Sequence, residues 1–327
     1  MKTFITMLIA ILVTSATAQK NLDSLYKTNL ELRRTIGVIY SEKYILNSDP
    51  GDLTFFDQGH PHGRQFLLVS NIVPYFAITR RRSPLYFVIN PIVRIRQFLN
   101  QTSLPIRTPS YQIGGLLFFN PFSHDIEHYK YLSAGIYHHS NGQDGPALNE
   151  DGSVNFKTGN FVTNYFVFNF FNGYHRDEIN SYYKVGLELH SGLFKIGDEP
   201  LLRPWFSKFR INGQYSISKY GSSENLSGLK GISPTTDRYL RTRVMLDATI
   251  GLDDFDATWN QHFNVELKYY YNLWYGENTT LFASVGYMGI DYYNIYFKEP
   301  YPFIRIGIAA GAPLRPIEKV KFTSKNL

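Results

Sequence analysis

Apolar and polar residues alternate one for one along much of this chain. In residues 239–252 the even positions are apolar except for one threonine, whereas the odd positions include Arg241, Arg243 and Asp247. Residues 182–190 and 262–273 alternate in the same way. Successive side chains of a β-strand point to opposite faces, so this period predicts strands with one apolar and one polar face.

Further segments have the length and apolar content of strands, and turn residues separate many of them. They cover residues 34–46, 66–80, 84–98, 110–121, 128–140, 160–174, 205–217, 279–293 and 300–311. Many exceed the five or six residues typical of strands in a soluble sandwich, and reach the roughly 9–11 residues that a tilted strand needs to cross a bilayer. We therefore expect an all-β fold, a transmembrane antiparallel β-barrel of about 12 strands. A soluble β-sandwich is the alternative.

The N-terminus has the pattern of a secretory signal. Lys2 precedes an apolar run at 4–13, and Ala-Thr-Ala at 16–18 offers a cleavage site. The apolar run is too short to span a membrane as a helix, which needs about 20 residues. The expected division is a signal peptide at 1–18, an N-terminal segment at 19–60 (leader, plug or first hairpin), the main β-barrel at 61–312 and a basic C-terminal tail at 313–327.

Composition narrows the class of protein. The chain has 327 residues, no cysteine and a formal net charge of +6. The absence of cysteine excludes a disulfide framework and any thiolate site. Lysine and arginine alternate with apolar residues and do not cluster, so we assign the charge to the barrel lumen and loops and expect no nucleic-acid partner. With a secretory signal, these features predict the cell outer membrane as the location.

The segment 129–142 carries the candidate chemistry. Its even positions are apolar up to Ile136 and continue as His138 and Ser140, so both lie on the lipid-directed face, whereas His139 points into the lumen. Two residues on one side of a strand lie about 7 Å apart at Cα. A histidine beside a serine can accept the hydroxyl proton as the oxygen attacks an ester. From the residues alone, polar side chains at the end of a strand without any chemistry remain the alternative.

The run 138–142, His-His-Ser-Asn-Gly, resembles the H-x-S-N-G motif of the outer-membrane phospholipase A family. Residues 105–111 resemble the family's P-F-R-x-x-x-Y stretch, and residues 303–308 resemble its closing strand. Those proteins are twelve-stranded barrels that hydrolyse acyl esters of phospholipids with a Ser–His–Asn triad on the outer wall, and they need calcium and dimerisation. The resemblance implies a calcium-dependent phospholipase A, of A1/A2 type, that is a homodimer when active. Ser140 would be its nucleophile and His138 its general base.

The third member of such a triad should lie on the next strand and on the same face. Asn160 and Asn164 share the parity of the apolar residues between 162 and 170. Counting from the turns at the opposite end places Asn164 level with His138 and Asn160 higher. An amide that accepts from the second ring nitrogen can orient the imidazole. We expect Asn164 in this role, with Asn160 as the second choice.

The loop between these two strands offers oxygen ligands suited to calcium: Gln143, Asp144 and Asp151. A solvated acidic loop is the alternative. The chain departs from the family here, since Gln143 stands where the family has an arginine, Leu104 stands where it has a serine, and the S-x-S-x-N-R run before the return strand is absent. These departures concern the metal site more than the serine and histidine.

Two other functions fit a barrel. A non-catalytic channel or structural protein would have a water-filled lumen, which the charged inward residues of 239–252 and 262–273 argue against. A surface adhesin would bind its ligand without Ser140.

Overall fold

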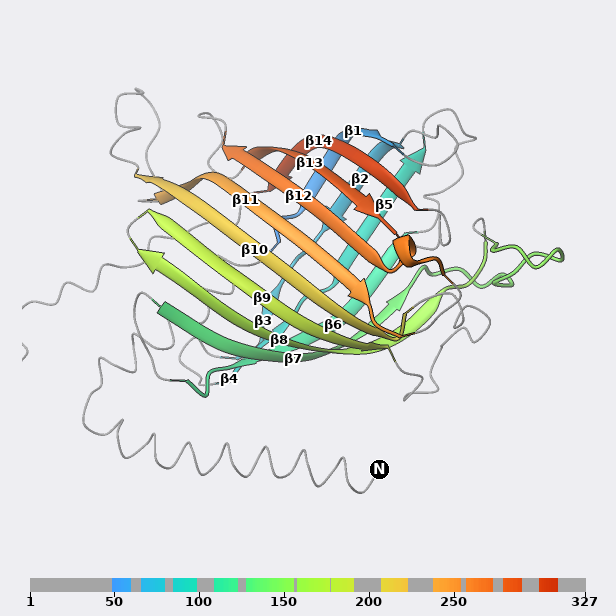
Figure 1. Cartoon of the computed structure of the whole chain (residues 1–327), viewed down its shortest axis with the longest axis horizontal. Helices are drawn as coiled ribbons and strands as arrows, with labels where there is room; N and C mark the ends of the chain where they lie inside the picture. The colour runs from blue at the N-terminus through green and yellow to red at the C-terminus, as the bar shows by residue number, and fades with distance from the viewer. Residues whose placement is uncertain are drawn as a thin grey trace, which may run out of the picture.

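Antiparallel strands dominate the computed structural model of this chain (Figure 1). It describes residues 49–59, 66–79, 85–98, 109–122, 128–155, 158–176, 178–190, 207–222, 238–253, 257–272, 279–289 and 300–310. The predicted signal peptide at 1–18, the tail at 313–327 and the weak candidate strand at 34–46 lie outside these residues. Within them, no helix is long and apolar enough to cross a membrane.

The described residues form fourteen strand segments. They are β1 (Asp52–Gln58), β2 (Phe66–Ile72), β3 (Phe76–Ala77), β4 (Leu85–Ile89), β5 (Ile92–Phe98), β6 (Ser110–Phe119), β7 (His128–Ser140), β8 (Val162–Arg176), β9 (Ile179–His190), β10 (Phe209–Ser222), β11 (Arg238–Gly251), β12 (Phe263–Asn272), β13 (Thr279–Met288) and β14 (Tyr301–Ala310). A short 3-10 helix, η4 (Trp259–Gln261), precedes β12.

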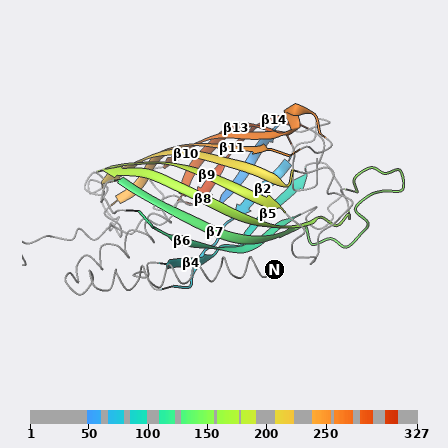
Figure 2. The same ribbon diagram turned by 60° about the horizontal axis from the view of Figure 1, so that its bottom comes forward.

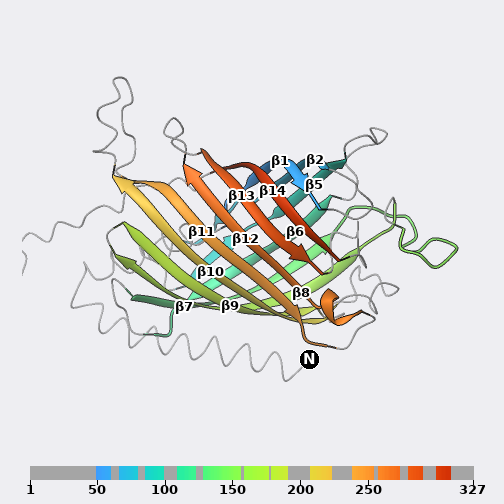
Figure 3. The same cartoon turned by 45° about the horizontal axis from the view of Figure 1, so that its top comes forward.

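These segments make a closed barrel of 12 strands, as the alternation predicts. β4 and β5 both pair with β6 and act as one strand, and β3 and β2 continue one another beside them. The interruptions contain Pro74 and Pro91, and proline has no N–H to donate to a ladder. The ring closes because β1 pairs with β14 and β6 pairs with β7. Figure 3 shows β1 between β2 and β14.

The barrel begins earlier than the expected boundary at residue 61. β1 lies within the segment 19–60 and pairs with β2 and β14, so residues 52–58 are part of the barrel wall. A register shift between Thr54 and Phe56 marks a bulge. The bulge sets both Phe55 and Phe56 outward, while Thr54 and Asp57 are buried. Two adjacent outward residues break the alternation, which is why the pattern did not reveal this strand.

The two faces of the barrel differ as the alternation predicts. On β11 the outward Val244, Leu246 and Ile250 are exposed, whereas Arg243 and Met245 are buried inside. Ion pairs cross the lumen side, with Lys268 Nζ 3.0 Å from Asp247 and Arg305 Nε 3.3 Å from Asp57. These ion pairs neutralise part of the charge on the lumen side.

Aromatic side chains pack the lumen at the end remote from Ser140. The buried cluster comprises Tyr86, Val88, Phe118, Tyr129, Tyr131, Phe171 and Tyr182. Tyr131 stacks on Phe171 with ring centroids 4.4 Å apart. Between this cluster and the other mouth lies a cavity of about 360 Å³ with mixed polar and apolar lining. The lumen is therefore partly filled and narrow.

Candidate functional site

β7 and β8 pair without a bulge from His128–Tyr174 to Ser140–Val162. This register places Asn164 directly opposite His138. Nδ1 of the His138 ring lies 2.9 Å from Oδ1 of Asn164. An amide oxygen can only accept, so Nδ1 carries the proton in this contact and Nε2 of a neutral ring is left as an acceptor. In this arrangement, Nε2 of His138 can accept a proton from a neighbouring group.

Ser140 is the last residue of β7 and lies two positions beyond His138 on the same outward face. The two residues are half-buried, and Ser140 pairs with Tyr111 of β6 and Val162 of β8. Within the described part of the chain, the Ser140 hydroxyl has no hydrogen bond to the His138 ring. Catalytic contacts of this kind are often long in the absence of substrate and tighten only when substrate is bound.

His139 points to the other side of the wall. It is 2% exposed, and its Nε2 lies 2.7 Å from Oγ of the buried Ser110. The edge-to-face contact with Phe161, at 5.2 Å between ring centroids, fills the space beside it. The structure thus holds a second serine–histidine pair, but inside the barrel and away from the outer wall.

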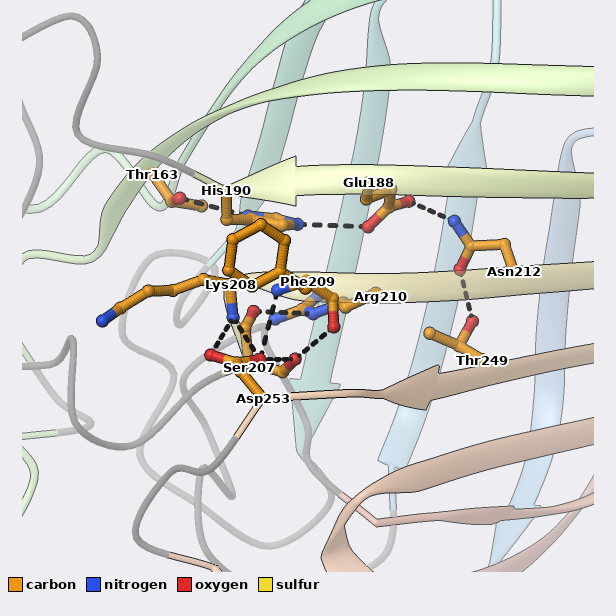
Figure 4. Close-up of polar contacts among 10 residues, drawn as sticks. All are labelled: Thr163, Glu188, His190, Ser207, Lys208, Phe209, Arg210, Asn212, Thr249 and Asp253. Atoms are coloured by element: carbon orange, nitrogen blue, oxygen red, sulfur yellow. Dashed lines mark hydrogen bonds and ion pairs between the residues drawn. The ribbon is translucent and has the colours of Figure 1, made fainter.

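A chain of hydrogen bonds runs along the lumen side of the same region (Figure 4). Thr163, the neighbour of Asn164, has Oγ1 3.2 Å from Nδ1 of His190, and Nε2 of His190 lies 3.1 Å from Glu188. Asn212 donates to Glu188 at 2.8 Å and accepts from Thr249 at 2.8 Å. This belt joins β8 to β11 and supports the wall behind Asn164. Sequence reasoning did not find it, because the alternating pattern does not give the register between strands.

Figure 4 also shows a second group of hydrogen bonds around Asp253, which follows β11. The two groups lie side by side, because the backbone N–H of His190 donates to the carbonyl of Lys208 at 2.7 Å. Its carboxylate accepts from the Ser207 hydroxyl and from the backbone N–H groups of Lys208 and Phe209, at 2.9 and 3.1 Å respectively. Burial opposes ionisation of Asp253, but these hydrogen bonds outweigh it and lower the pKa of the carboxyl below its ordinary value. These hydrogen bonds join the segment that precedes β10 to the segment that follows β11.

The loop between β7 and β8 extends beyond this end of the barrel (Figure 2). The bridges Gly145–Gly159 and Leu148–Val154 fold it into a narrow hairpin. Asn160 lies at the base of the loop, where its backbone N–H donates to Gly145 O at 3.0 Å. The side-chain contact with His138 is made by Asn164 and not by Asn160.

The expected calcium ligands do not come together. Gln143 and Asp144 lie at the base of this hairpin and Asp151 lies at its tip, with both bridges between them. The Asp151 carboxylate accepts from the hydroxyl of Ser153 at 2.5 Å and from its N–H at 2.9 Å, which lowers the pKa of Asp151. Across the described residues, no three histidine, aspartate or glutamate side chains form a group that could hold a metal. The sequence pattern did not show how the loop pairs with itself.

Comparison with known proteins concerns the fold. No protein-family model matches the sequence, and no curated protein sequence matches it. Among solved structures, the chain is similar to outer membrane phospholipase A from Escherichia coli, with a TM-score of 0.54 and 12% identity over 85% of this chain and 99% of that one. An active-site variant of that protein, in which alanine replaces an asparagine, gives a TM-score of 0.54 at 11% identity, with 85% of this chain and 99% of the other covered.

A third structure, the Salmonella typhi outer membrane phospholipase dimer with bound calcium, also gives a TM-score of 0.54 at 11% identity. It covers 86% of this chain and 99% of the other. At such identities the similarity establishes a shared barrel architecture over most of the chain, and the function has to be argued from the site.

Proposed function

We propose that this protein is an outer-membrane phospholipase A, which hydrolyses acyl esters of glycerophospholipids. Ser140 is the nucleophile, His138 the general base and Asn164 the group that orients the imidazole. The observation that carries the proposal is the 2.9 Å contact between His138 Nδ1 and Asn164 Oδ1 on the outward face that also carries Ser140. The fold it shares with outer membrane phospholipases supports the same assignment.

The reaction proceeds in two steps. Oγ of Ser140 attacks the ester carbonyl while Nε2 of His138 takes the hydroxyl proton. The C–O bond to the glycerol breaks, the imidazolium returns its proton to the departing oxygen, and an acyl-enzyme remains. Water then attacks the acyl-enzyme with His138 again as base, which releases a fatty acid and restores Ser140. Asn164 keeps the ring in the tautomer that leaves Nε2 free.

The negative oxygen that forms on attack needs a hydrogen-bond donor. Gly142 lies two residues after Ser140, and its backbone is in the left-handed region with φ of 66°. Its backbone N–H donates to no other group in the described part of the chain. We assign this N–H as an oxyanion donor on that ground.

The outward position of the site explains the substrate class. Ile136 and Phe168, which lie on the same face as His138, are exposed on the outer wall. In a membrane, phospholipid acyl chains would cover this wall and bring ester groups to the end of β7. Homodimerisation when active is part of the proposal, and the S. typhi neighbour, described as a dimer, supports it.

Calcium dependence is also part of the proposal, supported by the neighbour that is described with bound calcium. Gln143 and Asp144 at the base of the loop are the candidate ligands that remain near Ser140. We expect a chelator to reduce fatty-acid release. The Asp151→Asn variant should show the wild-type calcium titration, because its carboxylate is bound to Ser153 at the loop tip. A shift of that titration to higher calcium concentration would show that Asp151 is a ligand after all.

Replacement of Asn164 by alanine should lower kcat by about 10- to 100-fold, because the His138 ring loses the acceptor that orients it. KM should change little, since Asn164 is not expected to bind the substrate. The matched variant is Asn160→Ala, which leaves the contact with His138 intact. Initial rates of fatty-acid release from mixed micelles measure both. An equal or greater loss in Asn160→Ala would transfer the role to Asn160.

The function itself is tested with the purified, folded barrel in detergent with calcium. The proposal predicts that fatty acid and lysophospholipid are released in equal amounts. Planar-bilayer recording on the same preparation tests the channel alternative, which the lumen ion pairs and the aromatic cluster disfavour. Steady conductance without any lipid hydrolysis would overturn the proposal.

A further inference from the structure

Asn141 directly follows Ser140 and is 2% exposed. Its side chain makes three hydrogen bonds. Nδ2 donates to the carbonyl of Gly159 at 2.7 Å, and Oδ1 accepts from the N–H of Phe161 at 3.0 Å and from the N–H of Gln143 at 3.3 Å. The backbone N–H of Asn141 adds a fourth, to the carbonyl of Phe161 at 3.1 Å. All of these partners belong to the loop that begins at Asn141.

These bonds occupy the place where the β-ladder stops. The last ladder pair of β7 and β8 is Ser140–Val162. One residue further, the backbone of Asn141 still pairs with Phe161, while its side chain joins the incoming arm at Gln143 to the outgoing arm at Gly159 and Phe161. A buried amide left without these partners is costly, so the loop is held closed at its base.

The hydrogen bonds of Asn141 form a clamp at the base of the loop. This clamp is also anchored from inside the barrel. Phe161 is 1% exposed and packs edge-to-face on the His139 ring, which in turn contacts Ser110 of β6. Asn141 is therefore connected, through Phe161 and His139, to the wall that carries Ser140. Movement of the loop base would have to break these contacts as well.

The clamp constrains the two residues that flank Asn141, which are Ser140 and Gly142. Gly142 has φ of 66°, and a Cβ at this position would lie 3.1 Å from Cε2 of the Tyr111 ring. The conformation at Gly142 and the end of β7 at Ser140 are thus both defined by the clamp between them. A displacement of about 1 Å at reacting groups can cost about 100-fold in rate.

We propose that Asn141 is a positioning residue for the hydrolysis: it touches neither substrate nor reacting atoms, but holds Ser140 and the Gly142 N–H in place by closing the loop. This inference rests on the proposed function. It goes beyond the triad, because it makes the reactivity of Ser140 depend on the Asn141 side chain, which faces into the loop and away from the substrate.

Two substitutions separate this role from mere folding. Asn141→Ala removes all three side-chain hydrogen bonds, whereas Asn141→Asp keeps the acceptors for Phe161 and Gln143 and loses the donor to Gly159. The control is Asn149→Ala, since Asn149 lies in the same loop and its side chain donates to Ser153 and Val154 near the tip. Gel mobility with and without heating reports how much of each variant is folded barrel.

For folded protein, we expect Asn141→Ala to lower kcat and the rate of labelling of Ser140 by a sulfonyl fluoride about 100-fold, with little change in KM. Asn141→Asp should fall between Asn141→Ala and the wild type, and Asn149→Ala should match the wild type. Wild-type kcat and labelling in Asn141→Ala, or losses that only follow the folded fraction, would overturn the positioning role while leaving the proposed function intact. A wild-type protein that neither hydrolyses lipid nor labels at Ser140 would overturn both.

Discussion

Replacement of Ser140 by alanine is expected to reduce fatty-acid release by the folded barrel about 10,000-fold, to near the uncatalysed background. Without the hydroxyl, no acyl-enzyme can form, and His138 and Asn164 have no nucleophile to activate. Stability should hardly change, because Ser140 lies at the end of β7 and is half-buried. Titrated fatty acid, corrected for the folded fraction, is the measurement.

Ser110→Ala is the matched control for this experiment. Ser110 belongs to the other serine–histidine pair, in which its hydroxyl is hydrogen-bonded to His139 in the lumen. Its loss should lower the rate of hydrolysis far less than the loss of Ser140, because His139 still packs on Phe161 at the loop base. If Ser110→Ala abolished release and Ser140→Ala did not, the chemistry would lie inside the barrel and the account of the outer wall would be wrong.

Replacement of His138 by alanine should cause a loss of similar size, because the hydroxyl of Ser140 then has no base to take its proton. Initial rates of fatty-acid release by the two proteins, at equal folded fraction, give the comparison.

His139→Gln is the matched variant, since glutamine can keep a hydrogen bond to Ser110 from the same lumenal position. It should retain most of the activity. A larger loss in His139→Gln than in His138→Ala, at equal folded fraction, would contradict the assignment of the base.

The strands could be predicted from alternation wherever the ladder is regular. β7 and β8 pair without interruption, so counting residues along them correctly placed Asn164 level with His138. The pattern failed at β1, where the bulge puts Phe55 and Phe56 on the same side. It also did not show the breaks near Pro74 and Pro91, where the sheet continues across a gap in the hydrogen bonding.

The rest of the site depends on contacts that no local pattern encodes. The loop after β7 pairs with itself, which places Asp151 away from Gln143 and Asp144. The Asp151 carboxylate accepts a hydrogen bond from Ser153 instead. Asn141 could be recognised as part of a motif, but its bonds to Gly159 and Phe161 depend on how the loop returns to β8.

The central claim is that Ser140 is an activated nucleophile on the outer wall of the barrel. It is tested most directly by incubating the folded protein with a long-chain sulfonyl fluoride and locating the adduct by peptide mass spectrometry. We predict a single adduct on Ser140, formed in parallel with loss of activity and absent in His138→Ala. Complete inhibition without an adduct on Ser140, or equal labelling in His138→Ala, would contradict the account.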